Sequence, residues 1–147
     1  MPDIICAIRA GEGSRAVQNA AISAAQRRNG GLVFLYVIDH RILEVSDDSV
    51  RPSVRSELYW MGRTLVRIAV ARAQAAGLRD ACWAIREGDV GEEIARAVVE
   101  NGAQVLFMGA SRQAASGRPN SAASLADRLR TTTGVAVDVV LPPSADK

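Results

Sequence analysis

The sequence has no apolar run long enough to cross a bilayer and no marked excess of charge of either sign. Its 147 residues carry a net charge of +2, so no global field favours binding to nucleic acid or to a membrane. No apolar stretch approaches the roughly 20 residues that a spanning helix requires, and the start, Met1-Pro2-Asp3, lacks the basic region of a signal peptide. We therefore expect a cytoplasmic chain.

Cysteine, histidine and lysine are all scarce. Cys6 and Cys82 fall in two expected strands that are not neighbours, so we expect no disulfide and interpret both as small buried hydrophobic residues. The only histidine, His40, falls in an expected surface loop, and no nucleophile elbow, P-loop or C-x-x-C motif occurs. Lys147 is the only lysine, which we attribute mainly to genomic composition. These scarcities argue against an enzyme.

Short apolar runs alternate with amphipathic segments along the whole chain. Five expected strands alternating with four helices predict one doubly wound parallel sheet with helices on both faces, a Rossmann-like α/β fold. We expect a single domain over residues 1–147, with the tail 141–147 frayed. The expected strands cover residues 4–8, 32–38, 81–85, 105–109 and 135–141, and the helices begin near Ser14, Ser53, Asp89 and Ala122.

The segment from Asp39 to Pro52 shows no apolar periodicity, so we expect a long loop, either a lid or a solvated connection. The next segment, Ser53 to Ala76, reads as one long helix. Its expected inward residues are Leu58, Met61, Leu65, Ile68, Ala69 and Ala76, and its expected outward arginines are Arg55, Arg63, Arg67 and Arg72. This arginine face lacks the interleaved aromatic residues expected of a single-strand nucleic-acid surface.

The stretch from Val105 to Arg112 is where we expect the functional site. A run of large apolar residues ends at Gly109, a small polar segment follows, and a helical pattern resumes at Ala122. Ligands of open α/β sheets bind beside the carboxyl ends of the strands, and the free N–H groups of a helix start favour anions.

A second glycine pattern follows the first expected strand. Gly11-Glu12-Gly13-Ser14-Arg15-Ala16 fits G-x-G-x-x-A, and Asp39 ends the second strand, as in a dinucleotide site. The glycines come three residues too late for the tight turn, however, and the chain has no room for a substrate domain. A small dinucleotide-dependent enzyme is therefore our third hypothesis.

The Gly109 loop, the Gly88-Asp89 step and the helix segment Ser124-Leu125-Ala126-Asp127-Arg128 resemble a universal stress protein domain. The resemblance implies the strand order 3-2-1-4-5, a stress-response setting, and a homodimer through the last strand, here Val135 to Val140. Nucleotide-binding members carry Gly, two residues, Gly, about nine residues, then Gly-Ser or Gly-Thr. This chain keeps Gly109, but Arg112 replaces the second glycine and Ala123-Ser124 replaces Gly-Ser.

The resemblance also implies an aspartate after the first strand that contacts the nucleoside, where this chain has Arg9. A guanidinium cannot accept a hydrogen bond, although the end of the second strand near Val37 stays apolar and suits an adenine. Arg9, Arg112 and Arg118 would instead suit a basic anion pocket. The candidate ligand-binding residues are Arg9, Ala10, Val37, Gly109, Ser111, Arg112, Ala123 and Ser124.

We therefore expect a stress-response regulatory domain that binds a protein partner or a small anionic ligand, and does not bind ATP in the usual way of the family. The alternative is an ATP-binding member with a variant phosphate loop, which would make adenine nucleotide the cofactor. We expect no metal and no association with nucleic acid or membrane.

Overall fold

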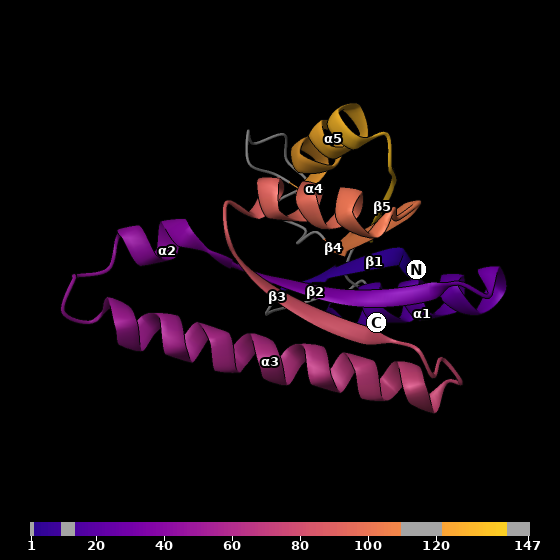
Figure 1. Cartoon of the computed structure of the whole chain (residues 1–147), viewed down its shortest axis with the longest axis horizontal. Helices are drawn as coiled ribbons and strands as arrows, with labels where there is room; N and C mark the ends of the chain where they lie inside the picture. Colours follow the sequence, from indigo (N-terminus) through magenta and orange to yellow (C-terminus); the bar gives the residue numbers. More distant parts are fainter. Residues whose placement is uncertain (1, 10–13, 110–121, 141–147) are drawn as a thin grey trace, which may run out of the picture.

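The sheet has five parallel strands in the order β3-β2-β1-β4-β5 (Figure 1). The computed structural model describes residues 2–9, 14–109 and 122–140. The predicted fold class and strand order are confirmed. The strands are β1 (Pro2–Ile8), β2 (Gly31–Asp39), β3 (Cys82–Gly88), β4 (Val105–Gly109) and β5 (Ala136–Val140), and the described helices are α1 (Ser14–Arg28), α2 (His40–Glu44), α3 (Arg51–Ala75), α4 (Val90–Asn101) and α5 (Ala122–Thr133).

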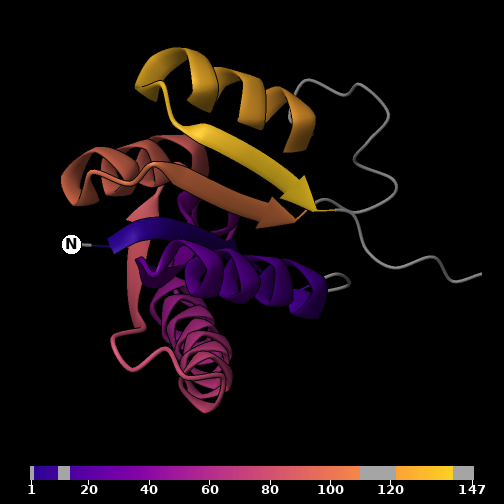
Figure 2. The ribbon, with the colours of Figure 1, turned by 90° about the vertical axis from the view of Figure 1, so that its right-hand side faces the viewer.

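Helices cover both faces of the sheet, with α1 and α3 on one side and α4 and α5 on the other (Figure 2). Successive residues of a strand point to opposite faces, so β1 supplies both cores. Ile4 and Cys6 enter the core beneath α1 and α3, whereas Ile5 enters the core beneath α4 and α5. All three are completely buried, which explains why β1 is apolar at successive positions.

The ends of α4 are set by side chains that the sequence identifies. Asp89 is the N-cap residue, and its carboxylate accepts a hydrogen bond from the N–H of Glu92 at 3.0 Å. Gly102 ends the helix in the left-handed conformation, at φ 61°, which glycine adopts without steric cost. The predicted cap and stop of this helix agree with the structure.

The rotation of α3 about its axis differs from the predicted one. The buried residues are Gly62, Val66, Ala69 and Ala73, whereas Met61, Ile68 and Ala76 of the predicted inward set are exposed. The prediction was wrong because it placed the largest apolar side chains inward. Small residues face the sheet instead, since the aromatic ring of Tyr36 on β2 already fills the space opposite Gly62.

The segment from Asp39 to Pro52 is not a long loop. Asp39 caps the short helix α2 by accepting a hydrogen bond from the N–H of Arg41, and Leu43 of that helix is buried. Arg51 then ties the connection together, because its guanidinium donates to the carbonyls of Leu43 at 2.7 Å and Ser46 at 3.0 Å. A helix of five residues is too short to produce a readable periodicity.

The two outer strands expose residues at the margins of the sheet. β5 is an edge strand, as the sequence predicts, and β3 forms the opposite edge. Cys82 begins β3 and is exposed, so the prediction that both cysteines are buried is wrong for this residue; Cys6 is buried, and both thiols are free.

No described helix combines the length and apolar character that a bilayer span requires.

Candidate functional site

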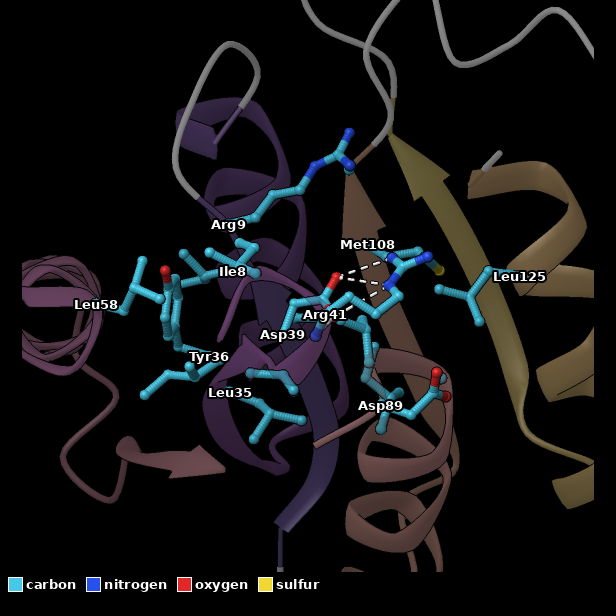
Figure 3. A pocket seen from close by; sticks show the side chains of 18 of the residues that line it. Ile8, Arg9, Leu35, Tyr36, Asp39, Arg41, Leu58, Asp89, Met108 and Leu125 are labelled. Carbon is cyan, nitrogen blue, oxygen red and sulfur yellow. Dashed lines mark hydrogen bonds and ion pairs between the residues drawn. The ribbon is translucent and has the colours of Figure 1, made fainter. Parts of the chain in front are cut away.

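A cavity of about 360 Å³ opens at the carboxyl ends of β1, β2 and β4 and is closed laterally by α2, α4 and α5 (Figure 3). The strand order reverses between β1 and β4, and ligands of open α/β sheets bind beside the carboxyl ends of the strands at such a point. Most of the wall is apolar. Its apolar side chains include Ile8, Leu35, Val37, Ile94, Met108 and Leu125.

Three arginines line this apolar cavity, each from a different element. Arg9 follows β1, Arg41 lies in α2 and Arg128 lies in α5. Among the described residues, the guanidinium of neither Arg9 nor Arg128 forms a hydrogen bond or an ion pair. Two guanidinium groups therefore remain available at the cavity for an anion.

Arg41 is engaged by Asp39, which also lines the cavity. The Nη2 atom of Arg41 lies 2.8 Å from Oδ2 of Asp39, and its Nε atom donates to both carboxylate oxygens at 3.2 Å (Figure 3). The hydrogen bond from Arg41 is the main cause that lowers the pKa of Asp39 below its ordinary value. Asp39 ends β2, where a dinucleotide site would need a free carboxylate to bind a ribose. The Arg41 guanidinium would compete with a ribose for this carboxylate.

The wall between α4 and α5 depends on Gly91. A β-carbon at this position would lie 2.9 Å from Nη2 of Arg128 and 2.9 Å from Cδ1 of Leu125. The missing side chain lets both residues of α5 approach the first turn of α4, where Asp89 acts as the N-cap. Gly91 thus helps to hold the Arg128 guanidinium beside the cavity.

His40 lies beside the cavity, between Asp39 and Arg41. Its Nε2 atom is 3.2 Å from a carboxylate oxygen of Glu44. The main-chain carbonyl of Gly88 is the largest cause that raises the pKa of His40, and the charge of Glu44 adds to it. The protonated ring is therefore favoured beside this carbonyl and the Glu44 carboxylate.

The structure brings some of the predicted site residues together and separates others. Arg9, Val37 and Gly109 line the cavity. Ala123 and Ser124 lie in the first turn of α5 and do not belong to the lining, although the same helix supplies Leu125 and Arg128. Ala10, Ser111, Arg112 and Arg118 lie outside the described residues, as do Gly11 and Gly13.

Two arginines of the cavity were not predicted from the sequence. Arg41 belongs to the segment expected to be a loop. It follows Asp39, the last residue of β2, by two residues, and this closeness to a strand end could have indicated a place at the cavity. Arg128 follows Leu125 by three residues and shares its helix face. In residues 2–9, 14–109 and 122–140, no three His, Cys, Asp or Glu side chains are arranged to hold a metal ion.

Comparisons with known proteins agree with this architecture. The model of the universal stress protein family matches residues 1–140. A solved universal stress protein UspA from Lactobacillus plantarum is 16% identical, with 95% of this chain and 97% of that chain covered and a TM-score of 0.75. No curated protein sequence matches the chain significantly.

Two further solved structures carry nucleotides. A universal stress protein in complex with cAMP is 17% identical, covers 97% of this chain and 98% of its own, and has a TM-score of 0.70. A universal stress protein family protein from Arabidopsis thaliana with AMP bound is 14% identical, covers 99% and 97%, and has a TM-score of 0.67. At identities this low, the likeness to these structures shows a shared fold alone.

Proposed function

The chain belongs to the universal stress protein family, and we propose that it is a stress-response regulatory domain that acts by binding a small anionic ligand in the cavity at the carboxyl ends of β1, β2 and β4. The observation that carries this proposal is the pair of arginines, Arg9 and Arg128, that line an apolar cavity without a carboxylate partner among the described residues. An apolar wall with convergent charged groups is the usual composition of a small-molecule site.

We propose that the ligand has an apolar body and one anionic group. The apolar side chains on β1, β2 and β4 suit the body, and the guanidinium groups of Arg9 and Arg128 suit a carboxylate or a phosphate. Arg9 offers donors and no acceptor, so it favours an anion over the hydroxyl and amine groups of a nucleoside. The mode of ATP binding usual in the family is therefore not expected here.

The alternative is a nucleotide. It is supported by the relatives of the same fold that were solved with cAMP and with AMP, and by the apolar end of β2 at Val37, which lines the cavity. Arg9 and Arg128 would then contact the phosphate, and the base would face the apolar wall. The two hypotheses differ in whether the purine and ribose contribute to affinity.

Thermal melts with matched ligands separate these hypotheses. Octanoate and octyl phosphate carry an apolar chain and an anion, octanol carries the chain alone, and Mg-ATP, AMP and cAMP carry the nucleotide. A ligand at about 100 times its Kd stabilises a protein by roughly 2.7 kcal/mol, and each kcal/mol raises the Tm of a domain of this size by about 2–4 °C. We expect a clear rise with octanoate or octyl phosphate and none with octanol.

Substitutions of the cavity arginines test whether the ligand binds in this cavity. Arg9→Gln and Arg128→Gln are expected to abolish the rise, whereas Arg79→Gln, an exposed residue between α3 and β3, keeps it. A larger rise with Mg-ATP than with octyl phosphate favours the nucleotide hypothesis. Equal rises with octanoate and octanol would contradict the anion site altogether.

We also propose a homodimer through β5. This strand lies at the edge of the sheet, and an unpaired edge offers main-chain N–H and C=O groups to a second strand. Pairing of β5 with its twofold-related copy would extend the sheet across the dimer.

A further inference from the structure

The outward face of α3 carries a stripe of apolar and small residues at heptad spacing. The stripe comprises Met61, Thr64, Ile68, Ala71 and Ala75, which alternate by three and four residues and are all exposed. Met61 is 41% and Ile68 53% exposed. The opposite face of the helix packs on the sheet through Gly62, Val66, Ala69 and Ala73, and no described element lies beyond the outer side of α3 (Figure 1).

Aromatic residues gather on the same side of the molecule. The chain has only two tryptophans, and both reach the surface: Trp60 of α3 is 56% exposed and Trp83 of β3 is 37% exposed. Trp83 pairs in register with Phe34, which belongs to the core under α1 and α3, so it projects from the sheet face that α3 covers. Tryptophan is seldom exposed on the surface of a soluble protein and is enriched at protein–protein interfaces.

The spacing of the stripe residues indicates which kind of partner structure could lie along α3. Apolar residues at alternating steps of three and four form the seam of a helix pair, and small residues such as Thr64, Ala71 and Ala75 let a second helix approach closely. Trp60, four residues before Thr64, borders the N-terminal end of the seam. The stripe therefore fits an amphipathic helix laid along α3.

The charges beside the stripe identify the chemistry of that helix. α3 contains five arginines and one glutamate, Glu57. Arg51 and Arg55 are neutralised by Asp48 and Glu87, but Arg63 stacks on Trp60 with its guanidinium carbon 5.1 Å from the ring centroid. Neither Arg63 nor Arg67 has a carboxylate partner among the described residues. Both lie along the Trp60 side of the stripe, at steps of three and four residues.

We propose that the outer face of α3, from Trp60 to Ala75, docks an acidic amphipathic helix of a partner protein. Carboxylates on such a helix would pair with Arg63 and Arg67, while its apolar residues cover Met61 and Ile68. A second copy of α3 fits less well, because two helices with this excess of arginine repel each other. The inference is independent of the ligand cavity and of the proposed function.

A selection experiment tests the proposal with the full-length protein. The probe is a displayed library of helical heptad peptides with apolar a and d positions and with Glu, Gln or Lys at the flanking positions. We expect the selected peptides to be rich in Glu, and a purified peptide of this kind to lose at least about tenfold in affinity, a change of ~1.4 kcal/mol, when Ile68→Glu or the pair Arg63→Glu and Arg67→Glu is introduced. A Lys-containing version of the peptide should recover binding to the charge-reversed variant.

The control is Val99→Glu on α4, which places the same charge at a residue that is 69% exposed outside the stripe and should leave affinity unchanged. Three results would overturn the proposal: selection of peptides without acidic enrichment, equal loss in the Val99→Glu protein, or a dimer of the wild-type protein that Ile68→Glu dissociates. Binding to phosphatidylglycerol vesicles that depends on Ile68, with no peptide selected, would overturn it as well and assign the stripe to a membrane surface.

Discussion

A β-carbon on Gly62 would lie 2.3 Å from Cδ2 of Tyr36, so α3 rests on β2 at a separation that only glycine permits. Tyr36 is 6% exposed and belongs to the core between α3 and the sheet. The contact fixes which side of α3 faces inward, and the exposed stripe on the opposite side follows from it.

Gly62→Ala should therefore destabilise the fold, although alanine is the better helix former. Overpacking costs about 1–3 kcal/mol, and the gain in helix propensity offsets about 1 kcal/mol of this. A lower midpoint of urea unfolding at an unchanged m-value is the expected result. In a Tyr36→Leu background the added methyl has room, so the penalty of Gly62→Ala should shrink there. A higher midpoint for the single variant would show that α3 shifts freely on the sheet.

The doubly wound α/β class could be predicted from the sequence pattern and the strand order from the family resemblance, but the rotation of α3 could not. A strand buried on both faces, such as β1, needs apolar residues at successive positions, and that pattern is visible without a structure. The inward side of α3 depends on the Tyr36 ring of another element, so Met61 and Ile68 were assigned to the core although they are exposed. A side chain's partner in a distant element leaves no trace in local periodicity.

Some residues of the candidate site could likewise be predicted from the sequence, and others could not. Arg9, Val37 and Gly109 could be placed at strand ends from the sequence, and they line one cavity. Arg41 was missed because α2 has only one buried anchor, Leu43. Arg128 was missed because its approach to the cavity depends on the absence of a side chain at Gly91.

Protonation of His40 should stabilise the fold in mild acid. Its pKa in the folded protein is raised above the ordinary value of 6.5, mainly by the Gly88 carbonyl. A raised pKa means that the stabilisation is complete below the ordinary pKa and is lost as pH rises through the folded pKa. The Tm difference between wild type and His40→Gln should therefore be larger at about pH 5.5 than at about pH 8.5.

Glu44→Gln provides the control for this pH dependence, because it should reduce the difference without removing the contribution of Gly88. The carboxyl of Asp39 does not interfere, since its pKa is lowered below an ordinary value of 3.8 and it stays ionised over this range. A Tm difference that is independent of pH would show that His40 has the same pKa in both states.

A thiol reagent should modify one cysteine per folded chain. Cys82 is exposed, whereas Cys6 is completely buried. Burial raises the pKa of both thiols, so Cys82 should react more slowly than a free thiol at neutral pH, because less of it is thiolate. Cys82→Ser should abolish the reaction until denaturant is added. Rapid modification of two thiols in the folded protein would contradict the packing of β1.

Val139→Pro should separate a β5-mediated dimer into monomers. The N–H of Ala136 points towards the neighbouring strand, where it bonds the carbonyl of Gln104 at 3.2 Å. Alternate residues of a strand point their N–H groups to opposite sides, so the N–H of Val139 points away from β4. Proline removes that donor and is tolerated at a sheet edge.

Val139→Thr keeps the N–H group and a side chain of similar shape, and it should remain dimeric. Light scattering is the measurement, with 15.6 kDa as the monomer mass. A dimer that survives Val139→Pro in a folded protein places the interface elsewhere, and a wild-type protein that scatters only as a monomer rejects the dimer.

Restoring three residues should create magnesium-dependent ATP binding. Arg9→Asp supplies an acceptor for a nucleoside hydroxyl or amine, and a hydrogen bond to a charged group contributes roughly 1.5–3 kcal/mol. Ala123→Gly opens the start of α5. Arg112→Gly, outside the described residues, restores the close main-chain approach that a phosphate loop needs.

Each ~1.4 kcal/mol corresponds to a tenfold change in Kd, so two recovered contacts should strengthen ATP binding about a hundredfold or more over wild type. Calorimetry with Mg-ATP measures this directly. Arg9→Met, combined with the same two glycines, is the matched control, because it removes the guanidinium without adding an acceptor and should bind less tightly than the aspartate version. Equal affinity of the two would show that Arg9 excludes ATP by its bulk and charge alone. If the folded triple variant does not bind, the length of the loop after Gly109 or the segment after Asp39 excludes ATP, and adding Arg41→Ala tests whether the guanidinium that occupies Asp39 contributes.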